Sequence, residues 1–353
     1  MKQHYKVLGI MSGTSLDGLD LCLVEFNQKG KQWKYEIVAC ETISYTKKWT
    51  ARLTKATKFS SAKLCQLDHE YGKLIGREVK AFLKKNHQEV DLIASHGHTV
   101  HHQPKKGFTL QIGNGAAIAA ETNCLIVSDF RSQDVALGGQ GAPLVPLGDR
   151  DLFMQHEACL NIGGITNVSF QSNGKRIALD IAPSNLVLNK LSETFFSLTY
   201  DKDGELSRKG VLHQKLMEQL DSWPYYRQQH PKSLGQEDIF PAFFNLLNSD
   251  QYSPIDLMHT FCKHWGKQVS RLLLKEGVSD NVLITGGGAK NKFLLECLDQ
   301  KINYHLPEEN LIDFKEALIF AYLGLKRSLN EINVLSSVTG ATQDHSAGAI
   351  YMG

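Results

Sequence analysis

Residues 12–18 (SGTSLDG), near the N-terminus, combine the side chains and the backbone freedom that phosphate binding needs. They lie between two β-rich runs, Tyr5 to Met11 and Leu19 to Phe26, which predict a hairpin. Consecutive N–H groups in such a turn form an anion nest, and the hydroxyls and the carboxylate suit phosphate oxygens and a hydrated Mg²⁺. The same residue types also make ordinary turns. The residues alone therefore leave a phosphate loop and a plain hairpin turn open.

Two further glycine clusters follow predicted strands. Thr285 to Asn291 (TGGGAKN) contains Gly286, Gly287 and Gly288, and Gly163-Gly164 follows the strand Ala158 to Ile162. A glycine turn that opens a helix lets an anion approach the backbone at the positive end of the helix dipole. Each cluster alone could be a tight turn, but clusters so far apart in the sequence favour a nucleotide cleft. Gly113-Asn114-Gly115 is not a dinucleotide fingerprint, because Ile118 stands where glycine or alanine is needed.

Asp180 ends the apolar run Ile177 to Leu179, just before the segment Ala182 to Asn185. A carboxylate at the end of a buried strand is placed as a general base would be. Aspartate is also a common N-cap, and a helix is expected to begin near Asn185. The sequence leaves both roles open for Asp180.

Four histidines, His96, His98, His101 and His102, fall within seven residues. In an extended segment His96 and His98 point the same way, as zinc ligands must. No His-Glu-x-x-His helix accompanies them, and a polar ligand-binding loop explains them equally well. We therefore expect no metal site here.

The composition excludes several classes of protein. The chain has 353 residues, 42% hydrophobic and 22% charged, with a net charge of +2 and no block of like charge. These values exclude a disordered chain and favour a small-molecule partner over nucleic acid or a membrane. Seven scattered cysteines without a Cys-x-x-Cys pair, and no apolar leader, favour the cytoplasm.

Alternation of strands and helices predicts an α/β protein with more than one core. An amphipathic pattern predicts a helix over residues 60–87, and a second strand–glycine turn–strand pattern starts at Ala158. The glycine- and proline-rich segment 138–146 (GGQGAPLVP) is the candidate hinge between lobes. We therefore expect a first lobe of residues 1–137 and a second of residues 138–353, whose final residues could return to the first.

Several motifs together resemble the bacterial anhydro-N-acetylmuramic acid kinases. They begin with residues 11–18 (MSGTSLDG) and occur in order along essentially the whole chain, and the strings at residues 13–18 and 138–146 are highly specific. The others are Ser95-His96-Gly97-His98-Thr99-Val100, Leu110-Gln111-Ile112-Gly113-Asn114-Gly115, Asp129-Phe130-Arg131, Asn161-Ile162-Gly163-Gly164-Ile165, Pro231-Lys232-Ser233-Leu234-Gly235, Gly286-Gly287-Gly288-Ala289 and Lys315-Glu316-Ala317.

The resemblance implies the two-lobed, ribonuclease H-like fold of sugar kinases, Hsp70 and actin, with ATP in the cleft between lobes. It implies an ATP- and Mg²⁺-dependent conversion of 1,6-anhydro-N-acetylmuramic acid and water to N-acetylmuramic acid 6-phosphate in cell-wall recycling. A cytoplasmic homodimer is also implied. Phosphoryl transfer relies on positioning and charge neutralisation, which glycine loops, hydroxyls and Mg²⁺ can supply.

By motif position, the resemblance makes Asp180 the base that activates water. His96, Arg131 and Glu316 line the sugar site. The ATP phosphates are assigned to Gly13, Thr14, Ser15, Leu16, Asp17, Gly18, Leu19, Asp20, Gly163, Gly164, Gly286, Gly287 and Gly288.

Two departures from the family pattern leave other functions open. The family usually has Asp-Thr-Gly-Pro-Gly-Asn where this chain has Asp180-Ile181-Ala182-Pro183-Ser184-Asn185, and it usually has glutamine at His98. Loss of two glycines restricts how closely a ligand approaches that backbone. A kinase for a different amino sugar or other small molecule, or a non-catalytic nucleotide-dependent binding protein of the same fold, are the alternatives.

Overall fold

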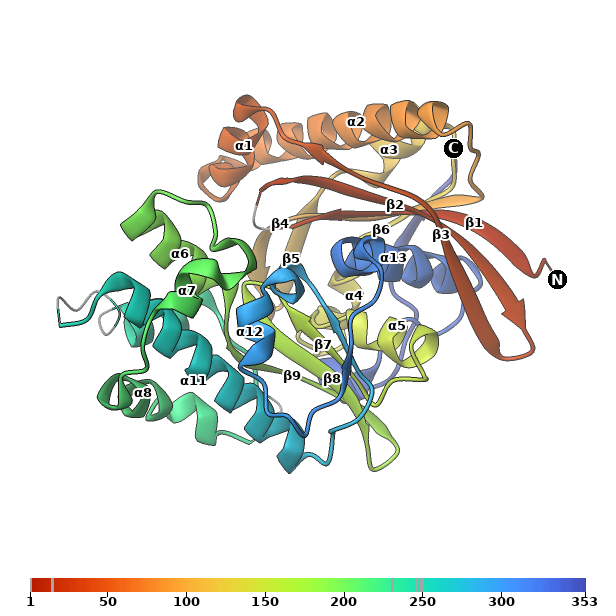
Figure 1. Cartoon of the computed structure of the whole chain (residues 1–353). Helices are drawn as coiled ribbons and strands as arrows, with labels where there is room; N and C mark the ends of the chain where they lie inside the picture. The colour runs from red at the N-terminus through yellow and green to blue at the C-terminus, as the bar shows by residue number, and fades with distance from the viewer. Residues whose placement is uncertain (1, 14–15, 230–231, 245–246, 248–250) are drawn as a thin grey trace. The chain divides into compact units, whose positions relative to one another are not determined.

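The chain folds into two compact units, each with its own β-sheet and helices (Figure 1). The computed structural model describes all residues except 1, 14–15, 230–231, 245–246 and 248–250, and the side chains of residues 236 and 237. Unit 1 comprises Met1–Phe153 and Phe314–Gly353, and unit 2 comprises Met154–Asp313. The predicted α/β class is confirmed, because helices alternate with strands in both units. No helix among the described residues is long and apolar enough to cross a membrane.

Unit 1 is built on a seven-stranded sheet of order β12-β6-β4-β1-β2-β3, with β5 paired to β4. Its strands are β1 His4–Ser12, β2 Gly18–Lys29, β3 Gln32–Ser44, β4 Leu92–Gln103, β5 Phe108–Ile112, β6 Ile126–Ser128 and β12 Ala349–Tyr351. β1 and β2 form the predicted antiparallel hairpin, and β4 runs parallel to β1 and β6. The turn between β1 and β2 is therefore the segment with the candidate phosphate loop.

Helices cover both faces of this sheet. The predicted amphipathic helix is α2, Ser61–Lys85, which buries Leu67, Tyr71 and Ile75 in the core of unit 1. In Figure 1 α2 runs alongside the sheet in orange. The other helices of unit 1 are α1 Lys47–Thr54, α3 Gly115–Thr122, α4 Ser132–Ala136, α5 Val145–Leu152, α14 Ser336–Thr339 and the greater part of α13 Glu309–Ser328.

Small residues let α13 lie directly against the sheet. A Cβ on Gly9 of β1 would stand 1.9 Å from the carbonyl oxygen of Ala317 in α13. A Cβ on Gly324 of α13 would stand 2.4 Å from the Cβ of Ala94, the β4 neighbour of Gly9. A buried ion pair of 2.8 Å between Lys315 Nζ and Asp149 Oδ1 joins α13 to α5. These contacts fix Glu316, between Lys315 and Ala317, relative to the strands.

Residues 138–146 are held inside unit 1, which differs from the expected hinge and from the expected boundary after residue 137. Gly141 N donates to buried Asp134 Oδ2 at 2.6 Å, and Gln140 N donates to the Thr339 carbonyl at 2.8 Å. Thr339 Oγ1 also donates to Asp134 Oδ1 at 2.7 Å. The buried carboxylate of Asp134 thus ties this segment to the C-terminal part of the chain, and unit 1 continues to Phe153.

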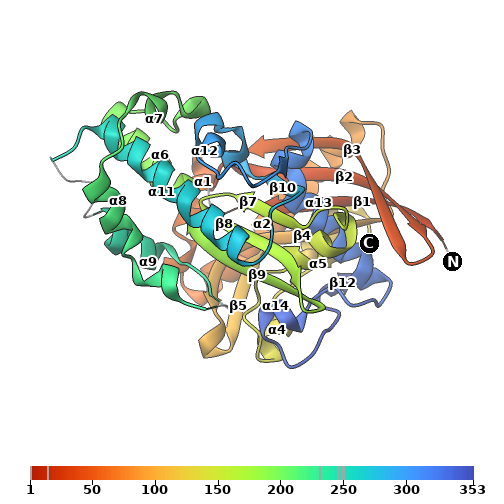
Figure 2. The same ribbon diagram turned by 60° about the horizontal axis from the view of Figure 1, so that its bottom comes forward.

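Unit 2 has a five-stranded sheet of order β11-β10-β7-β8-β9. Its strands are β7 Ala158–Ile162, β8 Ile165–Ser172, β9 Lys175–Pro183, β10 Val282–Thr285 and β11 Tyr304–His305. The helices are α6 Asn185–Phe196, α7 Glu205–Lys209, α8 Gln214–Asp221, α9 Gln236–Ile239, α11 Pro254–Lys275 and α12 Lys292–Glu296. α11 lies against the sheet at β8 and β9 (Figure 2), where Trp265 Nε1 donates to Thr166 Oγ1 at 2.8 Å. The predicted strand–glycine turn–strand pattern is confirmed as β7, Gly163-Gly164 and β8.

The close packing of α13 predicts the effect of a single added methyl group. Gly9→Ala should lower the free energy of unfolding by about 3 kcal/mol, because its Cβ would collide with backbone that cannot move independently. Urea unfolding monitored by circular dichroism measures this loss. Gly164→Ala is the matched control, because its Cβ would come no closer than 3.7 Å to any neighbouring atom. Equal stability of the two variants would contradict the packing described for α13.

Candidate functional site

A row of polar side chains crosses the sheet of unit 2. Thr285 of β10 pairs with Asn161 of β7, Asn161 pairs with Asn167 of β8, and Asn167 pairs with Asp180 of β9. Cross-strand partners face the same side of a sheet with Cβ atoms about 5 Å apart. The alternate residues, such as Leu160 and Val168, belong to the core that packs against α11. The row therefore lies on the face of the sheet opposite to that core.

The two glycine turns of unit 2 meet at one end of this row. β7 and β10 are parallel neighbours, so Gly163-Gly164 and Gly286-Gly287-Gly288 follow them at the same edge of the sheet. The carboxamide of Asn161 lies between the turns. A Cβ on Gly163 would be 3.4 Å from its Nδ2, and a Cβ on Gly286 would be 2.6 Å from its Oδ1.

The glycines of these turns divide into two groups by the space around them. Gly286 has φ +86°, and a Cβ on Gly288 would stand 2.2 Å from Ile162, so the fold itself requires both glycines. Gly163, Gly164 and Gly287 do not have positive φ, and a Cβ on any of them would meet no atom closer than 3.4 Å. Their open surface leaves room for a ligand to approach the backbone.

Asp180 is half-buried at the end of the row and uses only one carboxylate oxygen. Its Oδ2 accepts a hydrogen bond of 2.8 Å from Leu234 N, and Oδ1 has no partner among the described residues. Burial raises the pKa of Asp180 to about 6, against the opposing effects of the Leu234 N–H group and of Lys232. Ser184, not Asp180, is the N-cap of α6, so the helix-cap interpretation of Asp180 is wrong. A carboxylate with this pKa and one open oxygen can accept a proton near neutral pH.

The altered segment after Asp180 has its own contacts. The Ser184 hydroxyl donates to the carbonyl of Gly163 at 2.9 Å, and Ser184 N donates to the carbonyl of Gly164 at 3.0 Å. Ser184 is fully buried. A side chain therefore fits where the family usually has glycine, because its hydroxyl binds the turn between β7 and β8.

The first loop, in unit 1, is only partly described, since Thr14 and Ser15 lie outside the described residues. Gly13 and Leu16 are half-buried, and Leu16 has φ +61°. Asp17 is exposed. The close pairing of β2 with β3 requires a glycine at position 18, because a Cβ there would lie 2.6 Å from the Ile43 carbonyl oxygen. Leu19 lies in the core, so any contact of Leu19 with a ligand must use its backbone.

Asp20 ends this loop region at the start of β2. It accepts a hydrogen bond of 2.6 Å from Thr42 Oγ1 of β3, which fixes one of its oxygens. Desolvation of the Glu316 carboxylate raises its pKa, and the negative charge of Asp20 adds to this rise, so the two acidic groups are close enough to interact. Of the loop residues described, Asp17 and Asp20 are the two that present a carboxylate.

His96 and Arg131 are in direct contact in unit 1. Arg131 Nε donates to His96 Nε2 at 2.9 Å, His96 Nδ1 donates to the Gly97 carbonyl at 2.8 Å, and Arg131 Nη1 donates to the Gly141 carbonyl at 2.6 Å. Burial, and then the charge of Arg131, lower the pKa of His96 well below 6.5. His96 is therefore neutral. Glu316 is exposed on α13, and its charge interacts with that of Arg131.

His98 begins a second buried chain of polar groups. A hydrogen bond of 3.3 Å joins His98 Nδ1 to Ser12 Oγ, followed by bonds of 2.8 Å from Ser12 to Tyr45 Oη and 2.6 Å from Tyr45 to Tyr71 Oη. Burial lowers the pKa of His98 to about 4. Both ring nitrogens of His96 are already bonded, and no cluster of metal-binding side chains occurs in the described part of the chain.

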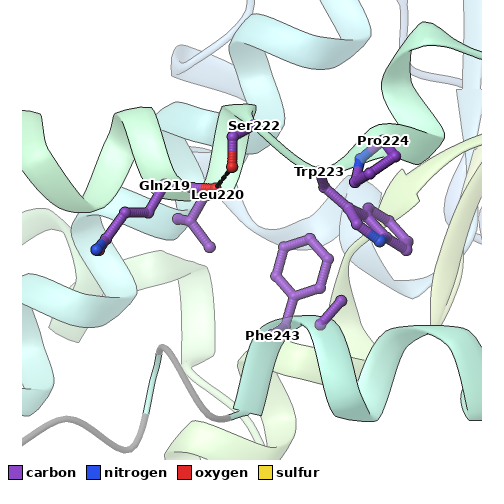
Figure 3. A pocket seen from close by; sticks show the side chains of 7 residues that line it. Gln219, Leu220, Ser222, Trp223, Pro224 and Phe243 are labelled. Atoms are coloured by element: carbon purple, nitrogen blue, oxygen red, sulfur yellow. Dashed lines mark hydrogen bonds between the residues drawn. The ribbon is translucent and has the colours of Figure 1, made fainter.

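Unit 2 also has a small pocket, which includes none of the residues of the polar row. It has a volume of about 160 Å³ and is lined by Gln219, Leu220, Ser222, Trp223, Pro224, Ala242 and Phe243. Figure 3 shows the rings of Trp223 and Phe243 beside it, with the Ser222 hydroxyl bonded to the Gln219 carbonyl. No ionisable side chain lines it, so it offers no acid–base chemistry.

Four residues of the site were not assigned from the sequence. Asn161 and Asn167 stand symmetrically about Gly164, because Ile162 pairs with Thr166 and three residues, 163–165, connect the two strands. A two-residue turn at Gly163-Gly164 would instead pair Asn161 with Thr166, so the glycines alone would have given the wrong partner. Tyr225 and Lys232 reach Asp180 from residues 45 and 52 positions further along the chain. Only their occurrence near a recognised motif could have suggested such a long-range contact.

The raised pKa of Asp180 predicts a stability change that depends on pH. Because the folded pKa of about 6 exceeds the ordinary value of 3.8, ionisation of Asp180 destabilises the folded state as pH rises between these values. Asp180→Asn should therefore be more stable than the parent by about 1–2 kcal/mol above pH 6, and this difference should disappear below pH 4. Urea unfolding across this pH range measures it. A difference independent of pH would contradict the raised pKa.

Comparison with known proteins identifies the family. The family model of anhydro-N-acetylmuramic acid kinase matches residues 5–353. The enzyme of that name from Mannheimia succiniciproducens is 34% identical, with 99% of each chain covered, and that from Francisella tularensis subsp. novicida is 32% identical, with 97% of each covered. Among solved structures, component A of (R)-2-hydroxyglutaryl-CoA dehydratase from Acidaminococcus fermentans has a TM-score of 0.46 at 13% identity, covering 92% of this chain and 99% of its own. The chain belongs to the anhydro-N-acetylmuramic acid kinase family.

Proposed function

We propose that this chain is an ATP-dependent kinase that converts 1,6-anhydro-N-acetylmuramic acid and water to N-acetylmuramic acid 6-phosphate and ADP in peptidoglycan recycling. The family match over residues 5–353 supports the reaction and the use of ATP. The observation that carries the assignment to residues is the open oxygen of Asp180, at the end of a polar row that reaches the glycine turns.

Asp180 is the general base in this proposal. In the anhydro sugar, O6 is bonded to C1, so phosphorylation at O6 requires that bond to break. Asp180 Oδ1 accepts a proton from water, the water oxygen bonds to C1, and the C1–O6 bond breaks. The freed O6 bonds to the γ-phosphorus of ATP, and ADP leaves. The pKa of about 6 suits this role, because the carboxylate is ionised at neutral pH yet still basic.

The glycine turns of unit 2 hold phosphate oxygens in this proposal. Gly163, Gly164 and Gly287 offer backbone without side chains in the way. ATP supplies the phosphoryl group, and Mg²⁺ neutralises the charge that develops on it. Asp17, exposed in the first loop, offers a carboxylate of the kind that Mg²⁺ prefers, directly or through water.

His96 and Arg131 provide the sugar site of unit 1. The neutral His96 accepts from Arg131, and so the guanidinium is fixed with further N–H groups for a ligand. A lactyl carboxylate, as in muramic acid, is the type of group that arginine recognises. Exposed Glu316 can accept hydrogen bonds from sugar hydroxyl or amide groups.

Turnover in ¹⁸O-water tests the proposed reaction. We expect ADP release with the anhydro sugar in preference to free N-acetylmuramic acid, with one ¹⁸O at C1 and none in the transferred phosphate. Mass spectrometry must read the label early, against a free-sugar control, because the anomeric oxygen exchanges slowly. Asp180→Asn should reduce turnover by about 10²–10⁴-fold while ATP affinity stays unchanged. Label in the phosphate, or preference for the free sugar or another amino sugar, would overturn the mechanism.

The open glycines predict a variant that separates folding from binding. Gly164→Ala should leave the free energy of unfolding unchanged, because its Cβ meets no atom within 3.7 Å. It should weaken ATP binding about tenfold or more, because the methyl group occupies the space that phosphate oxygens need. Calorimetric titration with ATP and Mg²⁺ measures the affinity. Gln171→Ala, an exposed residue near the other end of β8, is the control for binding. Unchanged ATP affinity in folded Gly164→Ala would mean that the turn binds no phosphate.

A further inference from the structure

One segment outside the sheet holds Asp180 at three points. Tyr225 Oη donates to the Asp180 carbonyl at 2.7 Å, Asp180 N donates to the Lys232 carbonyl at 3.3 Å, and Leu234 N donates to Asp180 Oδ2 at 2.8 Å. We call this segment the arm; its described residues are 225–229 and 232–234. β9 is an edge strand of the sheet, so the arm supplies the partners that a neighbouring strand would otherwise give.

The two ends of the arm are also bound to each other. Lys232 Nζ lies 4.4 Å from the centre of the Tyr225 ring and donates to the Tyr225 carbonyl at 3.4 Å. The Tyr225 ring packs against that of Trp223, with centres 5.1 Å apart. Each end also contacts Asp180. Displacing either Tyr225 or Lys232 therefore weakens the hydrogen bonds that fix the position of the Asp180 carboxylate.

The ammonium of Lys232 is half-buried and forms no ion pair with a carboxylate among the described residues. The charges of Asp180 and, on α11, of Arg271 and Lys275 act on Lys232, and those of Asp180 and Asp238 act on Tyr225. The arm also contains Arg227 and Tyr226, and the Tyr226 hydroxyl is bonded to His264 of α11 at 2.9 Å. Lys232 is the cation that interacts with Asp180, and its effect opposes the rise in the Asp180 pKa that burial causes. Without this cation, burial would act on the carboxylate with only the Leu234 N–H group in opposition.

We propose that Tyr225 and Lys232 are positioning residues for Asp180: together they fix its backbone and Oδ2 so that Oδ1 faces the reacting water, and Lys232 supplies the charge that favours the ionised form. This inference rests on the proposed role of Asp180 as the base. It assigns different effects to the two side chains. Tyr225 fixes geometry through a neutral hydrogen bond, whereas Lys232 acts on both geometry and charge.

The pH profile of turnover separates these effects. Lys232→Met should move the acid limb of kcat/KM for the sugar to higher pH by about 0.5–1 unit, because the carboxylate loses its stabilising cation. Lys232→Arg should restore the limb. Tyr225→Phe should lower kcat about 5–10-fold without moving the limb or changing KM for ATP. Lys190→Met, which removes an exposed lysine of α6 in the same unit, is the matched control. It should change neither the position of the acid limb nor kcat.

A measurement without substrate makes the inference independent of the reaction. The difference in free energy of unfolding between a protein with Asp180 and its Asp180→Asn variant depends on pH through the protonation of Asp180. This difference can be measured both with Lys232 present and with Lys232 replaced. Removal of Lys232 should move the midpoint of that curve upward by the same 0.5–1 unit as the kinetic limb. If Lys232→Met does not fold, Lys232→Gln replaces it, since the amide can still donate to the Tyr225 carbonyl.

The outcomes distinguish the two proposals. If the parent protein turns over no amino sugar, the proposed function is refuted. If the stability curve nevertheless shifts when Lys232 is removed, the effect of Lys232 on the pKa of Asp180 is still supported. A stability curve and an acid limb that both stay in place without Lys232 would overturn the charge effect. A Tyr225→Phe variant with the kcat of the parent would overturn its positioning role.

Discussion

The register of the strands in unit 2 is the constraint on which the candidate site depends. Thr285, Asn161, Asn167 and Asp180 stand in one row only because β10, β7, β8 and β9 pair in their observed register. A slip of one residue between β8 and β9 would turn Asp180 into the core and bring an apolar residue to the row. Burial of Leu160, Val168 and Leu179 in the core against α11 opposes such a slip. The packing of the unit therefore sets the position of the carboxylate.

Unit 1 uses a different means to fix its polar groups. His96 and Arg131 are not held by strand pairing alone, because Arg131 lies just before α4 and bonds the carbonyl of Gly141. The buried carboxylate of Asp134 binds Gly141 N and the Thr339 hydroxyl. It thereby fixes the position of Gly141, whose carbonyl binds Arg131. Small residues under α13 bring Glu316 close to the strands. In this unit, buried polar contacts between distant segments have the role that strand register has in unit 2.

The sequence predicted those elements whose pattern is local. The hairpin of β1 and β2, helix α2 and the strands around Gly163-Gly164 follow from periodicity and turn residues, and the structure confirms them. β3 was not predicted, because as an edge strand it exposes alternating polar residues and its one continuous apolar run, Ile37 to Cys40, is only four residues long. The expected hinge at 138–146 fails because glycine and proline content indicates irregular backbone, not mobility, and Asp134 binds this segment from within unit 1. Contacts such as Tyr225 with Asp180 cross 45 positions, and no local pattern encodes them.

The arm over β9 also answers a problem that every open sheet has. An edge strand presents unpaired N–H and C=O groups to which a strand of another chain can add. At Asp180 both backbone groups are already engaged, the N–H by the Lys232 carbonyl and the C=O by the Tyr225 hydroxyl. The contacts that orient the carboxylate therefore also prevent intermolecular pairing at this position of the edge strand. Selection against aggregation and selection for turnover thus act on the same residues, Tyr225 and Lys232. Selection against aggregation would still favour these contacts in a chain that had lost its activity.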